Sequence, residues 1–394
     1  MRAFTSVTVA LACAALGACG GGQTSELGEP VVFDIPATAE VTGPRLSTAG
    51  DGGLVLSWME QRGDGTALRY APLADGKLRA ANDVVVEARM FVNWADLPSV
   101  MHVEGEHWVA HWLRYSADRT YSYDVVVSQS FDGGREWSTP VAAHDDGTPT
   151  EHGFVSMFRA GDGVTLLWLD GRDTGKEPGD DPLAASMTLR AGTIRPDGSV
   201  NAARLVDDSV CDCCQTDVAM AADVPVAVYR DRTADEVRDI YVTRFVDGAW
   251  EPGVRLYADD WVIPGCPVNG PSIVANGNDV AVAWFSAAHD APVVRVARSR
   301  DGGKSFGMPV EVAAGRLAGY VGLAALPDGS LAVSWVARGE DGSNELRLRH
   351  VGADGSPGAV LSIARIEQLR VFPQLGFDGN TLVLFWTDGD KGTR

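Results

Sequence analysis

The chain has 394 residues, of which 45% are hydrophobic and 22% are charged. This ordinary globular composition excludes a wholly disordered chain, and the length suits one large or two average domains. The formal net charge of −20 argues against a nucleic-acid partner, because binding to phosphates requires clustered Lys and Arg.

The N-terminal stretch MRAFTSVTVALACAALGACGGG has one basic residue, then an apolar run that ends in small residues. This pattern predicts a secretory signal peptide. Its LGAC ending resembles the bacterial lipobox, which implies cleavage before Cys19 and lipidation of its sulfur; the alternative is an ordinary signal peptide with a chance cysteine. We therefore expect a signal peptide (1–18), a lipidated cysteine with a flexible tether (19–30) and a folded domain (31–394). The protein would lie in a bacterial cell envelope, attached to the membrane only by its lipid.

An apolar strand that carries an aromatic residue recurs along the chain, as in LVLSWME, VTLLWLD and LAVSWVA. Its spacing is roughly 50 to 60 residues, which is typical of propeller blades. Other short apolar strands precede and follow each copy, and no helical periodicity separates them. The recurring aromatic residues are expected to pack between neighbouring blades; they are Trp58, Trp112, Trp168, Tyr229, Trp284, Trp335 and Trp386.

These repeats predict a single all-β propeller of four-stranded blades. Seven repeat starts give seven blades, and six blades is the alternative if one repeat is irregular. The last repeat is cut short at Arg394, so the segment from Val31 to Ala39 is expected to add an outer strand to that blade and close the ring.

Two turns carry a more specific motif, SFDGGREW (Ser130 to Trp137) and SRDGGKSF (Ser299 to Phe306). Both resemble the Asp-box, or BNR repeat, of the sialidase superfamily. The Asp can accept turn N–H bonds, the glycines permit positive φ, and the aromatic residue can plug the blade. The motif therefore predicts the fold and does not by itself predict catalysis.

Polar residues gather in the loops that lead into the first strand of each blade and in the segments that leave the second strand. In a propeller these two sets lie on one face, so we expect a polar site at the channel mouth between the third and fifth blades. The structural alternative is a set of salt-bridged loops. The residues on this face include Asp96, His144, Glu151, His152, Asp170, Arg172, Cys211, Cys213, Cys214, Arg230, Asp231, Arg232, Glu236, Arg238, Cys266 and Tyr320.

The sialidase resemblance implies a catalytic set of three arginines that grip a sugar carboxylate, a Tyr–Glu nucleophile pair and an Asp acid/base. The first repeat, PRLSTAGDGGLVLSWMEQR, resembles the first sialidase blade and makes Arg45 the first clamp arginine. The segment GYVGLAALPDGSLAVSW resembles the nucleophile blade and nominates Tyr320. The diagnostic proline of the first blade is missing. The further candidates are Asp96, Glu151, Asp170, Asp231 and Glu236 for the carboxylates, and Arg62, Arg172, Arg230, Arg232 and Arg238 for the clamp.

The stretch SVCDCCQTD holds three of the four cysteines that follow the tether, and Cys266 is the fourth. In an oxidising compartment these cysteines are expected to form one or two disulfides. The alternatives are a Cu or Zn site made of Cys211, Cys213, Cys214 and Cys266, completed by His144 or His152, and a redox-active thiol.

Three hypotheses of function follow. The first is carbohydrate recognition or sialidase-type exo-hydrolysis of terminal acidic sugars, with a glycan or another small anionic ligand as the partner. The second is a non-enzymatic module that uses the cysteines with Cu or Zn. The third is a protein-binding scaffold. A monomer is expected in each case.

Overall fold

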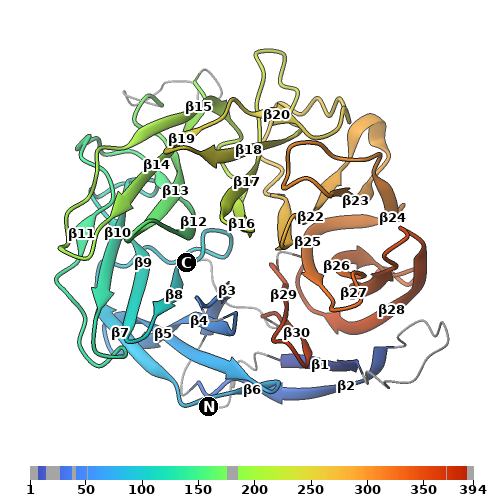
Figure 1. The fold of residues 1–394 in the computed structure, drawn as a ribbon, viewed down its shortest axis with the longest axis horizontal. Coiled ribbons are helices and arrows are strands. Elements are labelled where there is room, and N and C mark those ends of the chain that lie inside the picture. Colours follow the sequence, from blue (N-terminus) through green and yellow to red (C-terminus); the bar gives the residue numbers. More distant parts are fainter. Residues whose placement is uncertain are drawn as a thin grey trace.

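The computed structural model describes residues 8–14, 27–37, 41–50, 52–174, 185–369 and 371–387. These residues form seven antiparallel sheets of four or five strands each, arranged as a ring around a central axis (Figure 1). A short 3-10 turn, Ala288–Asp290, is the only helix within the described ranges, and no helix there is long and apolar enough to span a membrane. The predicted all-β propeller of four-stranded blades is confirmed.

Each of the seven repeats corresponds to one sheet, and we number these blades in repeat order with the innermost strand first. Blade 1 contains β3 (Val41–Thr48), β4 (Leu54–Arg62), β5 (Gly65–Ala74), β6 (Lys77–Leu78) and β7 (Asn82–Glu87). Blade 2 contains β8 (Ser99–Glu104), β9 (His107–Tyr115), β10 (Tyr123–Ser130) and β11 (Val141–Ala142). Blade 3 contains β12 (His152–Ala160), β13 (Gly163–Asp170), β14 (Met187–Ile194) and β15 (Arg204–Val210).

The remaining blades follow the same order. Blade 4 contains β16 (Asp217–Ala221), β17 (Val224–Arg230), β18 (Ile240–Val246), β19 (Ala249–Trp250) and β20 (Val254–Arg255). Blade 5 contains β21 (Ser272–Asn276), β22 (Asp279–Ser286), β23 (Val293–Ser299) and β24 (Val310–Ala314). Blade 6 contains β25 (Leu317–Ala325), β26 (Leu331–Arg338), β27 (Asn344–Val351) and β28 (Pro357–Ile366). Blade 7 contains β29 (Gln374–Phe377), β30 (Leu382–Phe385), β1 (Thr8–Ala14) and β2 (Leu27–Asp34).

The repeated aromatic residues lie on or directly after the second strand of each blade and are at most 1% exposed. Each packs against the preceding blade, as Trp168 of blade 3 does in the cluster that holds Leu113 and Val125 of blade 2. Trp58 of blade 1 shares a cluster with Phe385 of blade 7, which joins the first and last blades of the ring. The aromatic repeat therefore forms the inter-blade core, as its spacing predicts.

The two Asp-box turns have the expected local structure. Asp132 accepts backbone N–H bonds from Arg135 and Glu136, both at 3.0 Å, and a bond from the Ser130 hydroxyl at 2.8 Å. Asp301 repeats this pattern in the second copy. Both turns join the third and fourth strands of a blade, so they lie on the face that also holds the turns between first and second strands.

The N-terminal residues complete blade 7. Strand β2 is its outermost strand, in agreement with the outer strand expected near Val31, and β1 pairs between β2 and β30. Strand β1 belongs to the segment predicted as a signal peptide, which remains a prediction, as does the division at residue 31. Cys19 and its proposed lipid lie outside the described residues.

Candidate functional site

A cavity of about 960 Å³ lies on the propeller axis and is lined by the innermost strand of every blade. It extends from the loops that lead into these strands to the turns at their far ends. Hydroxyl and amide side chains such as Ser47, Ser99, Thr216 and Gln374 line its wall beside apolar ones. A concave site of this size with a few placed polar groups suits a small-molecule ligand.

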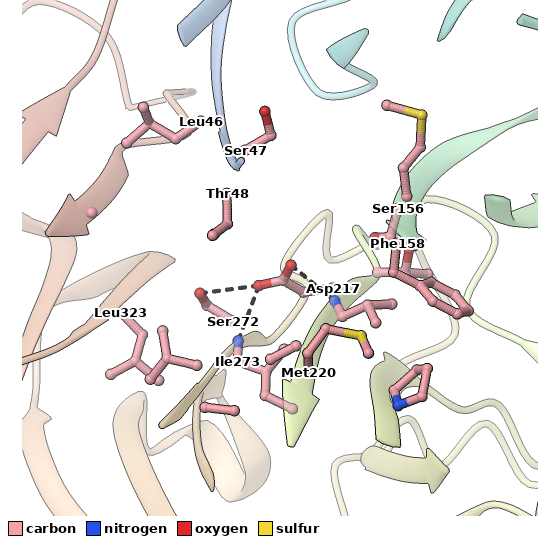
Figure 2. A pocket seen from close by; sticks show the side chains of 18 of the residues that line it. Leu46, Ser47, Thr48, Ser156, Phe158, Asp217, Met220, Ser272, Ile273 and Leu323 are labelled. Atoms are coloured by element: carbon pink, nitrogen blue, oxygen red, sulfur yellow. Dashed lines mark hydrogen bonds between the residues drawn. The ribbon is translucent and has the colours of Figure 1, made fainter. Parts of the chain in front are cut away.

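Arg45 on β3 is the cationic side chain of most interest in this cavity. Its nearest carboxylate is that of Asp217 on β16, at 4.0 Å, which is too long for a hydrogen bond. Asp217 is already held by other donors: Ile273 N–H at 3.0 Å, Val218 N–H at 3.0 Å and the Ser272 hydroxyl at 3.3 Å (Figure 2). Burial raises the pKa of Asp217, and Arg45 works against that rise.

The Arg45 guanidinium therefore retains unused hydrogen-bonding capacity. It has five N–H donors, and no hydrogen bond from it to another group is found among the described residues. Its side chain is 19% exposed, so a ligand in the cavity can reach it. A planar guanidinium suits a carboxylate, which it can bind through two parallel hydrogen bonds.

Three aromatic side chains lie where the lead-in loops meet the cavity. Trp94 stacks on Phe372 with ring centroids 5.4 Å apart, and Tyr320 meets both rings edge-on at 6.1 and 5.0 Å. Tyr320 and Phe372 line the cavity, whereas Trp94 packs behind them. Tyr320 has a φ of 54°, an uncommon conformation for a bulky residue, and Asn269 Oδ1 accepts a hydrogen bond from its N–H at 2.7 Å.

The lead-in loops contact one another across the axis. Gln215, before blade 4, donates from Nε2 to Ala95 O of blade 2 at 3.0 Å and accepts from Gly270 N–H of blade 5 at 3.2 Å. Asn269 in turn donates to Ala318 O of blade 6 at 3.2 Å. These bonds connect the loops that carry the predicted site residues. The other polar residues of this face form separate clusters.

Two of the nominated carboxylates, Asp96 and Glu151, meet at a tyrosine that the sequence did not single out. The Tyr123 hydroxyl lies 2.6 Å from Glu151 Oε1 and 3.2 Å from Asp96 Oδ2, and Asp96 Oδ1 accepts from Phe154 N–H at 2.7 Å. Burial raises the pKa of Asp96 to about 8 and that of Glu151 to about 7. The cluster ties blade 2 to blade 3 and is buried beside the cavity wall, since Asp96 and Tyr123 are each 1% exposed.

Five of the six nominated arginines are bound elsewhere, and the cavity lining includes none of them. Arg62 pairs with Asp83 on blade 1. Arg230 is buried and donates to three backbone carbonyls, with its guanidinium 4.8 Å from the Trp261 ring. Arg232 and Arg238 both bind Glu236, so this nominated carboxylate is held between two guanidinium groups.

Asp170 supports a tryptophan on blade 3. It accepts from Trp168 Nε1 at 2.9 Å and forms a bidentate pair with Arg172. In blade 1, Trp58 Nε1 likewise donates to Glu60 Oε2 at 3.4 Å, and the arginine that binds this carboxylate is Arg69 of β5. The tryptophan–carboxylate contact recurs at equivalent positions of the two blades, so it is a structural feature of the repeat.

His144 and His152 lie beside Asp170, and they do not join the cysteines in one ligand group. Their rings stack at 3.8 Å, His144 Nδ1 lies 2.7 Å from Asp146 Oδ1, and His152 Nε2 lies 3.3 Å from Asp146 Oδ2. Burial alone would lower the pKa of His152, but the surrounding carboxylates raise it above its usual value. These side chains form two groups of possible metal ligands, Asp124–His144–His152 and Asp146–His152–Asp170, and both are separate from the cysteine group.

The four cysteines form two disulfides, Cys211–Cys214 and Cys213–Cys266, which was the first of the expected states. The second bridge joins the lead-in loops of blades 4 and 5, as their neighbouring positions predict. Asp231, nearby on blade 4, has its pKa raised to about 7 by burial and by the adjacent Asp207.

The fold and the axial cavity define a single β-propeller with a ligand-sized site at its centre. No family model matches the chain, and no curated protein matches it. Among solved structures it is similar to an ulvan lyase of polysaccharide lyase family PL25, bound to -[GlcA(1-4)Rha3S]-, with a TM-score of 0.48 and 11% identity over 80% of each chain. It is also similar to a Hadza microbial sialidase, with a TM-score of 0.46 and 13% identity over 98% of this chain and 90% of that one. An α-L-arabinanase of Penicillium chrysogenum gives a TM-score of 0.46 and 12% identity over 98% and 99%.

Proposed function

We propose that the protein binds a terminal acidic sugar in its axial cavity, with Arg45 as the group that recognises the sugar carboxylate. The observation that carries this proposal is the Arg45 guanidinium, which lines the cavity beside a carboxylate whose oxygens already accept other hydrogen bonds. A bidentate bond from Arg45 to a ligand carboxylate would satisfy donors that the protein leaves unused.

The apolar side of the sugar would lie against Tyr320 and Phe372 on the same cavity wall. Aromatic faces combined with a few polar groups are typical of sites that orient a small polar ligand. Ser47 and Gln374 would supply hydroxyl and amide partners for the sugar hydroxyl groups. We expect binding rather than a full sialidase clamp, because the other nominated arginines are engaged outside the cavity.

Calorimetry with a sialylated trisaccharide and with an oligosaccharide that ends in a uronic acid tests the proposal. Replacement of Arg45 by Gln is expected to weaken binding by about 10- to 100-fold, since a charge-assisted bond contributes about 1.5–3 kcal/mol. Arg62→Gln is the matched control, because Arg62 pairs with Asp83 away from the cavity. Equal affinities for wild type and Arg45→Gln, or no binding of either sugar, would refute the proposal.

A fluorogenic sialoside separates binding from hydrolysis. If wild type hydrolyses the sialoside and Tyr320→Phe does not, the site would catalyse the sialidase reaction with Tyr320 as the nucleophile. Binding without turnover would show a recognition module.

A further inference from the structure

We propose that the two disulfides form a redox-gated site for a thiophilic metal ion, in which reduction converts them into four thiolate ligands for one Zn²⁺ or Cu⁺. This function is separate from sugar binding. It rests on the arrangement of Cys211, Cys213, Cys214 and Cys266 in the lead-in loops of blades 4 and 5.

The four sulfur atoms are already gathered. Sγ atoms of Cys211, Cys213 and Cys214 lie within 4.8 Å of one another, and Cys266 is bonded to Cys213. Thiolates around Zn²⁺ lie at about 2.3 Å from the metal, so neighbouring sulfurs of a tetrahedral site are separated by roughly 3.8 Å. Only small side-chain movements would be needed after the bridges open.

Contacts other than the disulfides hold the loop in place. Cys211 N–H donates to Arg230 O at 2.9 Å, and Asp212 accepts from Met187 N–H at 2.9 Å. Arg232 also donates to Asp212, at 3.0 Å. Because these bonds do not depend on the oxidation state of the cysteines, the ligand positions are expected to persist after reduction.

The local charge suits a thiolate cluster. The Arg238 guanidinium is fully buried, and its Nη1 lies 3.6 Å from Cys211 Sγ. Arg232 lies on the same loop network and is 4% exposed. A Zn²⁺ ion with four thiolates carries a net charge of −2. Arg238 is the cation beside Cys211, and it offsets part of this charge, since Arg232 and Arg238 also pair with Asp212 and Glu236.

The two disulfides differ in access to solvent. Cys266 is exposed and Cys213 is half-buried, whereas Cys211 and Cys214 are 0% and 1% exposed. An external dithiol can therefore attack Cys266 Sγ and expel the Cys213 thiolate; its second thiol then releases Cys266 and leaves the reductant as a disulfide. The freed Cys213 thiolate lies beside the Cys211–Cys214 disulfide. It can therefore attack that disulfide by thiol–disulfide exchange, which makes the buried pair accessible to reduction.

The electron and proton balance is complete with two equivalents of dithiol. Each protein disulfide takes up two electrons and two protons and yields two thiols, while each dithiol becomes a disulfide. Binding of the metal then releases up to four protons from the thiols, because thiolates are the ligands.

The experiment compares the full chain before and after anaerobic treatment with dithiothreitol and its removal. Reduction should add four titratable thiols, and about one equivalent of Zn²⁺ or Cu⁺ should bind to the reduced protein only, measured by competition with a chromophoric chelator. The double variant C211S/C214S should lose at least 10-fold in affinity for Zn²⁺, and H152A should bind as wild type does.

Near-UV circular dichroism of the reduced protein is recorded in parallel. Four outcomes would overturn the proposal: less than about 0.2 equivalents bound after reduction, equal binding before reduction, loss of binding in H152A with retention in C211S/C214S, or loss of the folded signal on reduction. The third outcome would place the metal at the histidine–aspartate cluster. The fourth would make the disulfides structural only.

Discussion

Replacement of Asp96 by Asn tests the buried cluster that joins blades 2 and 3, because it removes a titrating carboxyl and keeps its shape. Asp96 Oδ1 accepts from Phe154 N–H, and Oδ2 faces the Tyr123 hydroxyl. The amide oxygen of Asn can accept the same backbone bond, and its NH₂ group can donate to Tyr123. The variant therefore imitates the protonated form of Asp96.

The sign of the effect follows from the direction of the pKa shift. Burial raises the pKa of Asp96 to about 8 in the folded protein, far above the value of about 3.9 expected in the unfolded chain. The folded state then binds more protons than the unfolded state between these two values. The contribution of Asp96 to stability is complete below about pH 4 and is lost progressively as the pH rises toward 8.

The magnitude is set by one retained proton. The free energy of unfolding should decrease by up to about 1.4 kcal/mol per pH unit across this window. Glu151, whose pKa is raised to about 7, shares the same hydroxyl and adds to the slope. We expect Asp96→Asn to be nearly neutral at about pH 4 and to stabilise the protein by about 2–4 kcal/mol more at pH 8 than at pH 5.

Urea denaturation at several pH values between 5 and 8 measures this difference. Glu104→Gln is the control, because Glu104 lies at the exposed end of β8 and pairs there with Arg159. A stability change that is the same at pH 5 and pH 8 would contradict the argument. Destabilisation that increases with pH would show that Asp96 is needed as an anion.

Two further predictions concern packing and the buried arginine. Trp168→Ala should lower the free energy of unfolding by about 3–5 kcal/mol, because it empties the core between blades 2 and 3, and thermal denaturation would detect it. Arg230→Lys should also destabilise the protein, by about 3 kcal/mol, since a lysine cannot donate to all three carbonyls. The folded Arg230→Lys protein should bind the saccharide with the same affinity as wild type. A 10-fold loss of affinity would show that Arg230 takes part in ligand binding.

The blade repeat and the local turns can be predicted from the order of the residues alone. The recurring aromatic residues, from Trp58 to Trp386, are large apolar side chains at regular intervals, and their burial is favourable. Antiparallel sheets that pack face to face around a ring bury all of them. Asp132 and Asp301 form their bonds within a few residues of the chain, so their turns could be predicted without knowing the fold.

Which of the polar residues face the cavity depends on how the blades pack together. Arg45 and Arg230 have the same chemistry in the sequence, yet one lines the cavity and the other is buried against carbonyl groups of blades 4 and 5. The pairing of Asp96 and Glu151 at Tyr123 likewise joins residues of two blades, and the choice among the possible disulfides depended on the distance between two loops. Side-chain roles of this kind depend on neighbours that are distant along the chain. The repeat placed the loops of blades 4 and 5 next to each other, but it did not determine which of their side chains would meet.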